Sequence, residues 1–181
     1  TTMLQTSTKI YQKLQKQYSR RINLDLKRIK KVLEKLGNPE NYLNNVINVV
    51  GSDGKNSFLT SLKFFLEAES KKVNTFTSPH LYDVRQRFYL GGRFISLKEI
   101  IKYKRLIEKT RLKLTLFELL TCIYILSAKK TDFNSYNLIE SGLLFKKDST
   151  NLWSLPIAQV VTNLNMQHAE WIKPKTINEI C

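Results

Sequence analysis

The sequence predicts an α/β fold in which a mostly parallel β-sheet is flanked by helices. Short β-branched runs alternate along the chain with segments whose apolar residues recur at helical spacing. A glycine-bearing loop joins the first of these runs directly to the helical segment after it. The chain has 181 residues, of which 42% are hydrophobic, so it is large enough for one core and too apolar to be disordered.

The first half of the chain gives the clearest elements. Residues 24–36 form an amphipathic helix, with its apolar face made of Leu26, Ile29, Val32, Leu33 and Leu36. Gly37, Asn38 and Pro39 end this helix, because glycine and asparagine follow the last apolar residue and proline lies beyond. Residues 46–50 are a buried strand, and the apolar spacing of residues 57–68 predicts the next helix.

The alternation continues in the second half. We expect strands at residues 73–76, 136–139 and 160–162, and an exposed strand at 87–90 before the Gly91-Gly92 turn. Residues 96–109 form a basic helix. Residues 116–128 are apolar almost all round, which predicts a buried helix with Cys122 as an inert thiol.

The charge balance is strongly basic, with 30 Lys and Arg against 15 Asp and Glu and a formal net charge of +15. Such an excess suggests an anionic partner: nucleic acid, a phosphorylated ligand or a polycarboxylate. The basic residues are interleaved with apolar ones at helical spacing, which favours solvated helix faces. Two cysteines cannot form a disulfide scaffold, and no apolar run reaches the roughly 18–20 residues needed to span a bilayer. The polar N-terminus has no apolar signal core, so we expect a cytoplasmic chain.

The strongest chemical signal is the segment GSDGKNS between the first strand and its helix. A phosphate-binding loop needs glycines that let N–H groups turn inward, a lysine that reaches the phosphates, and a helix N-terminus behind it. In the common pattern Ser or Thr follows the lysine directly, whereas here Asn56 intervenes. The alternative is a polar surface turn that contains a lysine. The predicted nucleotide-binding residues are Gly51, Ser52, Asp53, Gly54, Lys55, Asn56 and Ser57.

Seven ordered segments resemble the folylpolyglutamate synthase/dihydrofolate synthase family, which is Mur-ligase-like. Residues 50–57 resemble its V/A-G-T-N-G-K-G-S loop, and residues 77–81 are identical to its T-S-P-H-L loop. Residues 24–39 look like its opening helix, residues 87–96 are similar to R-I-x-I-N-G-x-x-I-S, and residues 114–118 to L-T-x-F-E. Residues 140–151 match part of E-V-G-L-G-G-R-L-D-A-T-N, and residues 162–171 are similar to T-N-I-G-x-D-H-x-E-W. The resemblance runs from about residue 10 to the last residue.

The resemblance implies a P-loop, Mur-ligase-like ATPase fold and an ATP-dependent ligase. ATP phosphorylates a carboxylate of a reduced pteroate or folate, and the amino group of L-glutamate attacks the acyl phosphate. Magnesium and lysine neutralise the phosphates in such a reaction. The resemblance therefore implies ATP and Mg²⁺ as cofactors, small-molecule substrates, and a monomer without a membrane or nucleic-acid partner.

The resemblance also implies roles for individual residues. Ser78, Glu140 and His168 are the implied magnesium ligands, and Lys55 and His168 the implied catalytic residues. Thr115, Phe117 and Asp148 are the implied substrate residues, the first two in the pterin pocket. On the residues alone, Ser78 is equally a turn residue, Glu140 a solvated carboxylate, His168 a surface histidine and Phe117 a core side chain. His80 receives no role.

This chain departs from the family at several positions. Asn56 replaces a glycine, the sequence Leu144-Phe145-Lys146 replaces G-G-R, and Gln167 replaces an aspartate. Family proteins are also longer. We therefore expect residues 1–181 to be the N-terminal ATP-binding domain, truncated before its end and without the C-terminal domain, with Met3 as the start and no activity alone. Two alternatives remain open, a basic nucleic-acid-binding module and a cell-wall Mur-type ligase.

Overall fold

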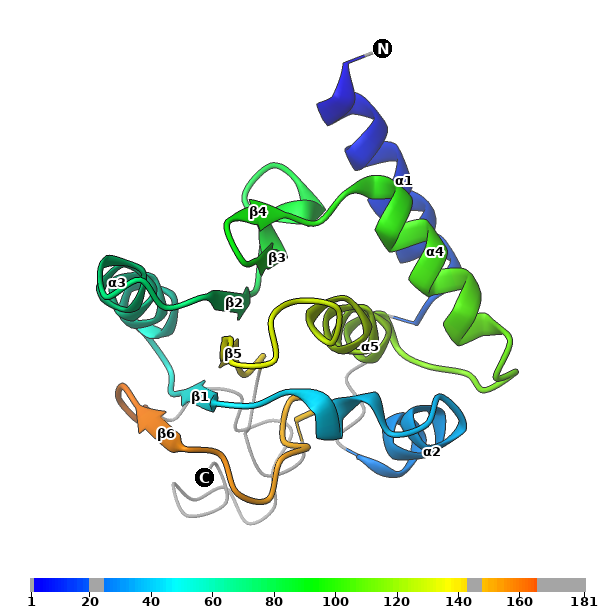
Figure 1. Ribbon diagram of the computed structural model, residues 1–181. Helices are drawn as coiled ribbons and strands as arrows, with labels where there is room; N and C mark the ends of the chain where they lie inside the picture. Colours follow the sequence, from blue (N-terminus) through cyan, green and yellow to red (C-terminus); the bar gives the residue numbers. More distant parts are fainter. Residues whose placement is uncertain (1, 20–24, 143–147, 166–181) are drawn as a thin grey trace.

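The computed structural model describes residues 2–19, 25–142 and 148–165, which build one six-stranded sheet with helices on both faces (Figure 1). The helices are α1 Met3–Gln17, α2 Lys27–Lys35, α3 Lys55–Ala68, α4 Leu97–Glu108 and α5 Leu116–Ala128, with short 3-10 helices η1 Pro39–Tyr42 and η2 Val84–Arg87. The strands are β1 Val46–Val50, β2 Val73–Phe76, β3 Phe88–Leu90, β4 Arg93–Phe94, β5 Tyr136–Glu140 and β6 Ala158–Val161.

The sheet confirms the predicted α/β class. Its strand order is β4-β3-β2-β5-β1-β6, and β2, β5, β1 and β6 run parallel. In this register Val46 of β1 lies opposite Asn137 of β5, and Ile47 lies opposite Ala158 of β6. Helix α3 connects β1 to β2, and α4 and α5 lie between β2 and β5 in the chain, which explains why strand and helix patterns alternate in the sequence.

The β3–β4 hairpin corrects the prediction of an exposed strand at residues 87–90. Strand β3 pairs antiparallel with β2, and the side chains of Phe88 and Leu90 are buried. The Phe88 ring packs on Phe76 of β2, with the ring centroids 5.6 Å apart. Arg87, which directly precedes β3, is also buried. A three-residue strand is too short for its alternation to reveal which face is covered.

Helix α5 forms the centre of the larger core, as its apolar sequence predicts. It covers one face of the sheet and α3 covers the other (Figure 1). Tyr124 and Cys122 of α5 are fully buried, so the prediction of a buried thiol is confirmed, and burial raises the pKa of this thiol. None of the helices in the described part of the chain is long and apolar enough to cross a membrane.

Helix α1 was not expected, because the N-terminal segment is mostly polar. A capping box between Thr2 and Gln5 begins the helix, and Leu14 anchors it in the core. It runs beside α4 (Figure 1), where the side chains of Gln17 and Tyr18 both donate to Glu108 at 2.7 and 3.0 Å. Contacts with the rest of the fold stabilise this short helix, because Ile10 and Tyr11 pack against the core beside Leu14.

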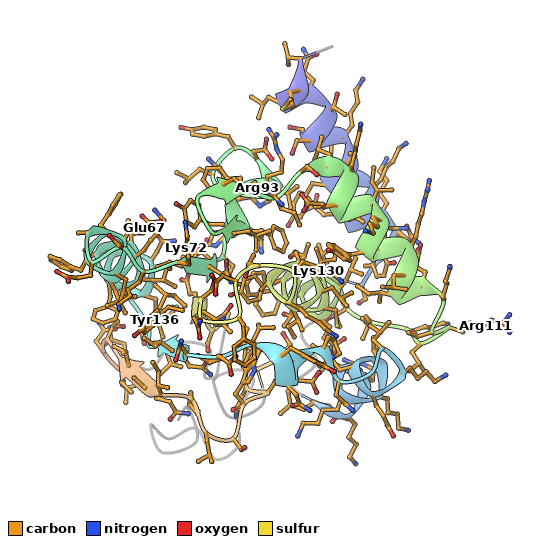
Figure 2. The ribbon with its side chains drawn as sticks, in the orientation of Figure 1. Glu67, Lys72, Arg93, Arg111, Lys130 and Tyr136 are labelled. Atoms are coloured by element: carbon orange, nitrogen blue, oxygen red, sulfur yellow. The ribbon has the colours of Figure 1, made fainter. Side chains whose placement is uncertain are left out.

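The junction of β4 and α4 predicts a pH dependence of stability. Arg93 (Figure 2) donates to both carboxylate oxygens of Glu99, at 2.7 and 2.9 Å, and lowers the pKa of Glu99 to about 2. A depressed pKa gives stability that is present above the usual value of 4.5 and is lost as the pH falls toward 2. We expect Arg93→Gln to flatten the dependence of melting temperature on pH in this window. An equal slope in both proteins would contradict this assignment.

Candidate functional site

The carboxyl ends of four neighbouring parallel strands form the candidate site. Strand β1 leads into the loop of residues 51–54, and β2 leads into the segment containing Ser78. Strand β5 ends at Glu140, and β6 leads into Thr162. Ligands bind at this edge in parallel α/β sheets because the loops there gather around one crevice. The topology therefore brings the predicted loop, Ser78 and Glu140 together.

The loop of residues 51–54 has the conformation that its glycines allow. Gly51 has φ +135° and Gly54 has φ +78°, both in the region that favours glycine. Gly54 is the N-cap of α3, and the first N–H groups of a helix have no partner within it, which makes them available to an anion. The Lys55 Nζ atom donates to the carbonyl oxygens of Gly51 at 2.7 Å and Ser52 at 3.3 Å. The ammonium group therefore lies against the loop.

The segment after β6 clamps this loop, a feature that the sequence analysis missed. The backbone N–H groups of Ser52 and Asp53 donate to Asn163, to its carbonyl oxygen at 2.9 Å and its Oδ1 at 2.8 Å. The Thr162 hydroxyl donates to the Asp53 carbonyl oxygen at 2.6 Å, and the Asn165 N–H donates to Ser52 Oγ at 2.8 Å. In the sequence, the polar residues directly after the last apolar strand are the one sign of this contact. Their role becomes visible only when β6 is seen to pair with β1, because the pairing places them beside the loop.

This clamp predicts that Gly51 cannot be replaced. A Cβ atom at Gly51 would overlap Thr162 Oγ1 and lie 2.8 Å from the Asn163 carbonyl oxygen. We expect Gly51→Ala to destabilise the protein by about 2–3 kcal/mol, measured by urea unfolding, because steric overlap adds to backbone strain. Gly92→Ala is the matched control, because Gly92 also has positive φ but no atom lies within 4 Å of the place where its Cβ would stand. Equal losses in the two variants would contradict the clamp.

Glu140 is a buried carboxylate, although a glutamate at the end of a strand is ordinarily solvated. It is 4% exposed, and its Oε2 atom accepts from the Ser78 backbone N–H at 3.1 Å. Burial raises the pKa of Glu140, while the Ser78 N–H, the Lys55 and Arg87 charges and the Asn56 amide act in the opposite direction. The carboxylate and the Ser78 hydroxyl are hard oxygen donors, which suit a magnesium ion that also binds phosphates. The donor set that the structure describes therefore fits this ion.

The third implied magnesium ligand, His168, lies outside the described residues, as do Gln167 and residues 144–146. Within the described ranges no group of three or more His, Cys, Asp or Glu side chains could hold a metal ion. A cation held by Glu140 and Ser78 would therefore depend on phosphate oxygens, water or residues beyond these ranges for its other ligands.

The three implied substrate residues lie near α5. Phe117 is half-buried and stacks on Phe76 of the core, with the ring centroids 5.8 Å apart. Phe117 and Asp148 both lie against Gly142, where an added Cβ would be 2.8 and 3.4 Å from them. Thr115 is the N-cap of α5, and its hydroxyl accepts from the Glu118 N–H at 3.3 Å. The structure thus brings Phe117 and Asp148 together and gives Thr115 a helix-capping contact.

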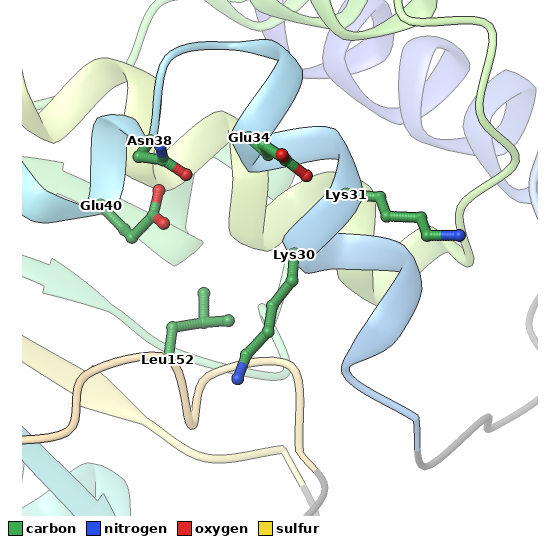
Figure 3. A pocket seen from close by; sticks show the side chains of 6 residues that line it. All are labelled: Lys30, Lys31, Glu34, Asn38, Glu40 and Leu152. Atoms are coloured by element: carbon green, nitrogen blue, oxygen red, sulfur yellow. The ribbon is translucent and has the colours of Figure 1, made fainter.

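Two pockets in the described structure differ in their relation to this site. One, of about 490 Å³, lies beside Ser78 and is bounded by α3, β2 and the β3–β4 hairpin. The other, of about 380 Å³, lies between α2 and the segment containing Leu152, with Lys30 extending toward Leu152 and Lys31 pointing away (Figure 3). Its exposed charged side chains, Lys30, Lys31 and Glu34, have both signs and do not point toward a common centre. We therefore place the functional site at the strand ends.

Known proteins share this arrangement, although no family model matches the chain. Dihydrofolate synthetase of Saccharomyces cerevisiae is 34% identical over 170 residues, covering 88% of this chain and 38% of the relative. The solved structure of Escherichia coli FolC in complex with DHPP and ADP superposes with a TM-score of 0.85 and 27% identity, covering 96% of this chain and 41% of FolC. The chain belongs to the folylpolyglutamate synthase/dihydrofolate synthase family.

A further solved structure from this family contains bound ligands. A bifunctional folylpolyglutamate synthase/dihydrofolate synthase with Mn, AMPPNP and L-glutamate bound superposes with a TM-score of 0.80 and 25% identity. The match covers 99% of this chain and 42% of that structure. The chain thus spans about two fifths of the length of these folylpolyglutamate synthase/dihydrofolate synthase relatives.

Proposed function

We propose that this chain is the ATP-binding part of a ligase that adds L-glutamate to dihydropteroate or folate. In this proposal residues 1–181 belong to the N-terminal ATP-binding domain of a cytoplasmic, monomeric enzyme. The main support is the convergence of the Gly51–Gly54 loop, Lys55 and the buried Glu140 at one sheet edge. Relatives of this fold bind ADP or AMPPNP, DHPP, Mn and L-glutamate, which is the ligand set this reaction needs.

Each residue in this proposal would have one role: to bind a phosphate, to hold the cation or to contact the substrate. Lys55 and the N-terminus of α3 would bind the β- and γ-phosphates of ATP. Glu140 and Ser78 would hold Mg²⁺, with His168 as a further ligand, and the ion would neutralise the phosphate charge. Thr115 and Phe117 would line the pterin pocket, and Asp148, which lies with Phe117 against Gly142, would be a further substrate residue.

The bond changes explain why these groups must converge. A carboxylate oxygen of the pteroate or folate attacks the γ-phosphorus of ATP, and the bond to the leaving ADP breaks. The glutamate nitrogen then attacks the acyl carbon and loses a proton, and phosphate leaves as the amide forms. Because both steps place negative charge on phosphate oxygens, a cationic site that also holds the carboxylate in line lowers the barrier.

Calorimetric titration of the chain with AMPPNP, with and without Mg²⁺, tests this proposal. We expect binding that requires the cation, and a separate response to dihydropteroate. The +15 charge provides a competing outcome. Absence of Mg-AMPPNP binding, together with duplex DNA binding that falls steeply with log salt, would replace the ligase by a nucleic-acid-binding module.

A further inference from the structure

His80 lines the pocket beside Ser78 and accepts a hydrogen bond from a buried arginine, Arg87. The Arg87 Nε atom donates to His80 Nδ1 at 2.9 Å, and Arg87 is 7% exposed. The Tyr11 ring of α1 meets the His80 ring edge-on, with centroids 4.5 Å apart. Arg87 also donates to the Tyr11 hydroxyl at 3.3 Å. Arg87 and Tyr11, which also contact each other, therefore fix the His80 imidazole.

This contact determines which nitrogen of His80 has the proton. A guanidinium group only donates hydrogen bonds, so His80 Nδ1 must accept and is unprotonated. A neutral imidazole then has its proton on Nε2.

The loop that contains His80 is held in place independently of any ligand. The Ser7 hydroxyl of α1 donates to Asp83 Oδ1 at 2.5 Å, and Asp83 caps η2 by accepting from the Arg85 N–H at 2.9 Å. The Gln86 side chain accepts from the N–H groups of Leu81 and Tyr82 at 3.2 and 3.1 Å. The imidazole is therefore fixed before a ligand arrives, which reduces the entropy cost of binding.

The lysine that lines this pocket, Lys63, is already engaged by other groups. Lys63 Nζ lies 3.1 Å from a Glu67 carboxylate oxygen and 4.1 Å from the centroid of the Tyr89 ring. His80 also lines the pocket, and among the described residues its hydrogen bond is at Nδ1 and not at Nε2. The same pocket is lined by Asn56 at the start of α3 and by Ser78 beside Glu140. It therefore joins His80 to the candidate site.

We propose that His80 is a substrate-binding residue whose Nε2–H donates to an anionic oxygen in this pocket. The oxygen belongs either to the terminal phosphoryl group of the nucleotide or to the carboxylate that receives it. This inference rests on the proposed function, because the two anionic groups are those of the ligase reaction. Arg87 is a positioning residue that acts through the imidazole.

Long-range ¹⁵N NMR of the chain at neutral pH tests the tautomer and the contact together. The chain has two histidines, so a His80→Gln spectrum assigns the resonances. We expect His80 to be protonated on Nε2, and its Nε2 resonance to move on ligand addition. A shift with Mg-AMPPNP alone identifies the phosphoryl oxygen, whereas a shift only with dihydropteroate identifies the carboxylate.

Affinities of matched variants complete the test. His80→Ala should weaken binding of the responding ligand by roughly 10-fold, whereas His80→Gln, which keeps an N–H near the Nε2 position, should stay within about threefold of wild type. Arg87→Lys should give mixed tautomers and an intermediate loss. Circular dichroism checks that each variant is folded.

Two results would overturn the inference. The first is a wild-type His80 protonated on Nδ1. The second is a protein that binds Mg-AMPPNP while its His80 resonance moves with neither ligand, which leaves the proposed function intact. If the wild-type chain binds neither ligand, the proposed function fails and the His80 contact fails with it, although the tautomer is still read directly.

Discussion

Replacement of Lys55 by alanine should abolish Mg-AMPPNP binding, with affinity at least about 30-fold weaker by calorimetry. The Lys55 Nζ atom lies against the Gly51 and Ser52 carbonyl oxygens, within the loop that would surround the phosphates. Loss of the ammonium group removes a positive charge from this loop, so the phosphate charge of the ligand is less well neutralised. The fold should survive, because these two contacts are local to the loop.

Lys98→Ala is the control for this prediction, because Lys98 is an exposed lysine on α4 and its removal changes the net charge equally. If binding depended only on the overall positive charge, the two variants would weaken it to the same small extent. Equal affinities of Lys55→Ala and Lys98→Ala would therefore show that the loop is a surface turn and not a phosphate site.

Replacement of Glu140 by glutamine should separate stability from cation binding. The carboxylate is buried and its pKa is raised, so its ionised form opposes folding. Glutamine has nearly the same shape and keeps an oxygen for the Ser78 N–H. We expect thermal unfolding to show stability unchanged or higher by about 1 kcal/mol, while Mn²⁺ affinity in the presence of AMPPNP, read by electron paramagnetic resonance, falls by at least about 10-fold.

Glu34→Gln is the matched control, because Glu34 is an exposed carboxylate on α2. It should change neither stability nor Mn²⁺ affinity. A Glu140→Gln protein that is clearly destabilised would mean that the carboxylate is a structural acceptor. An unchanged Mn²⁺ affinity would remove Glu140 from the proposed cation site.

The sequence predicts those elements whose residues share a local pattern. Strand β2 and helix α5 have the predicted bounds, and the predicted loop lies between β1 and α3. These elements are predictable because each buries apolar residues that lie close together in the sequence. The loop lysine and glycines follow from the same logic, since a strand, a glycine turn and a helix N-terminus are contiguous in the chain.

What the sequence does not predict depends on distant partners. Helix α1 and the buried face of β3 become explicable only through contacts with α4, η2 and β2. The clamp of Thr162 and Asn163 on Ser52 and Asp53 joins residues about one hundred positions apart. The burial of Glu140 likewise comes from the sheet order, which places β5 between β1 and β2. The role of His168 remains a prediction.

The complete burial of Cys122 gives the protein an internal reporter of its own opening. A thiol with no solvent access and a raised pKa reacts with a disulfide reagent only from conformations that expose α5. With Cys181→Ser removing the second thiol, the labelling rate of the remaining cysteine measures how often the core opens. Labelling with and without a nucleotide would then give the stabilisation that binding confers, without any attached dye or introduced probe.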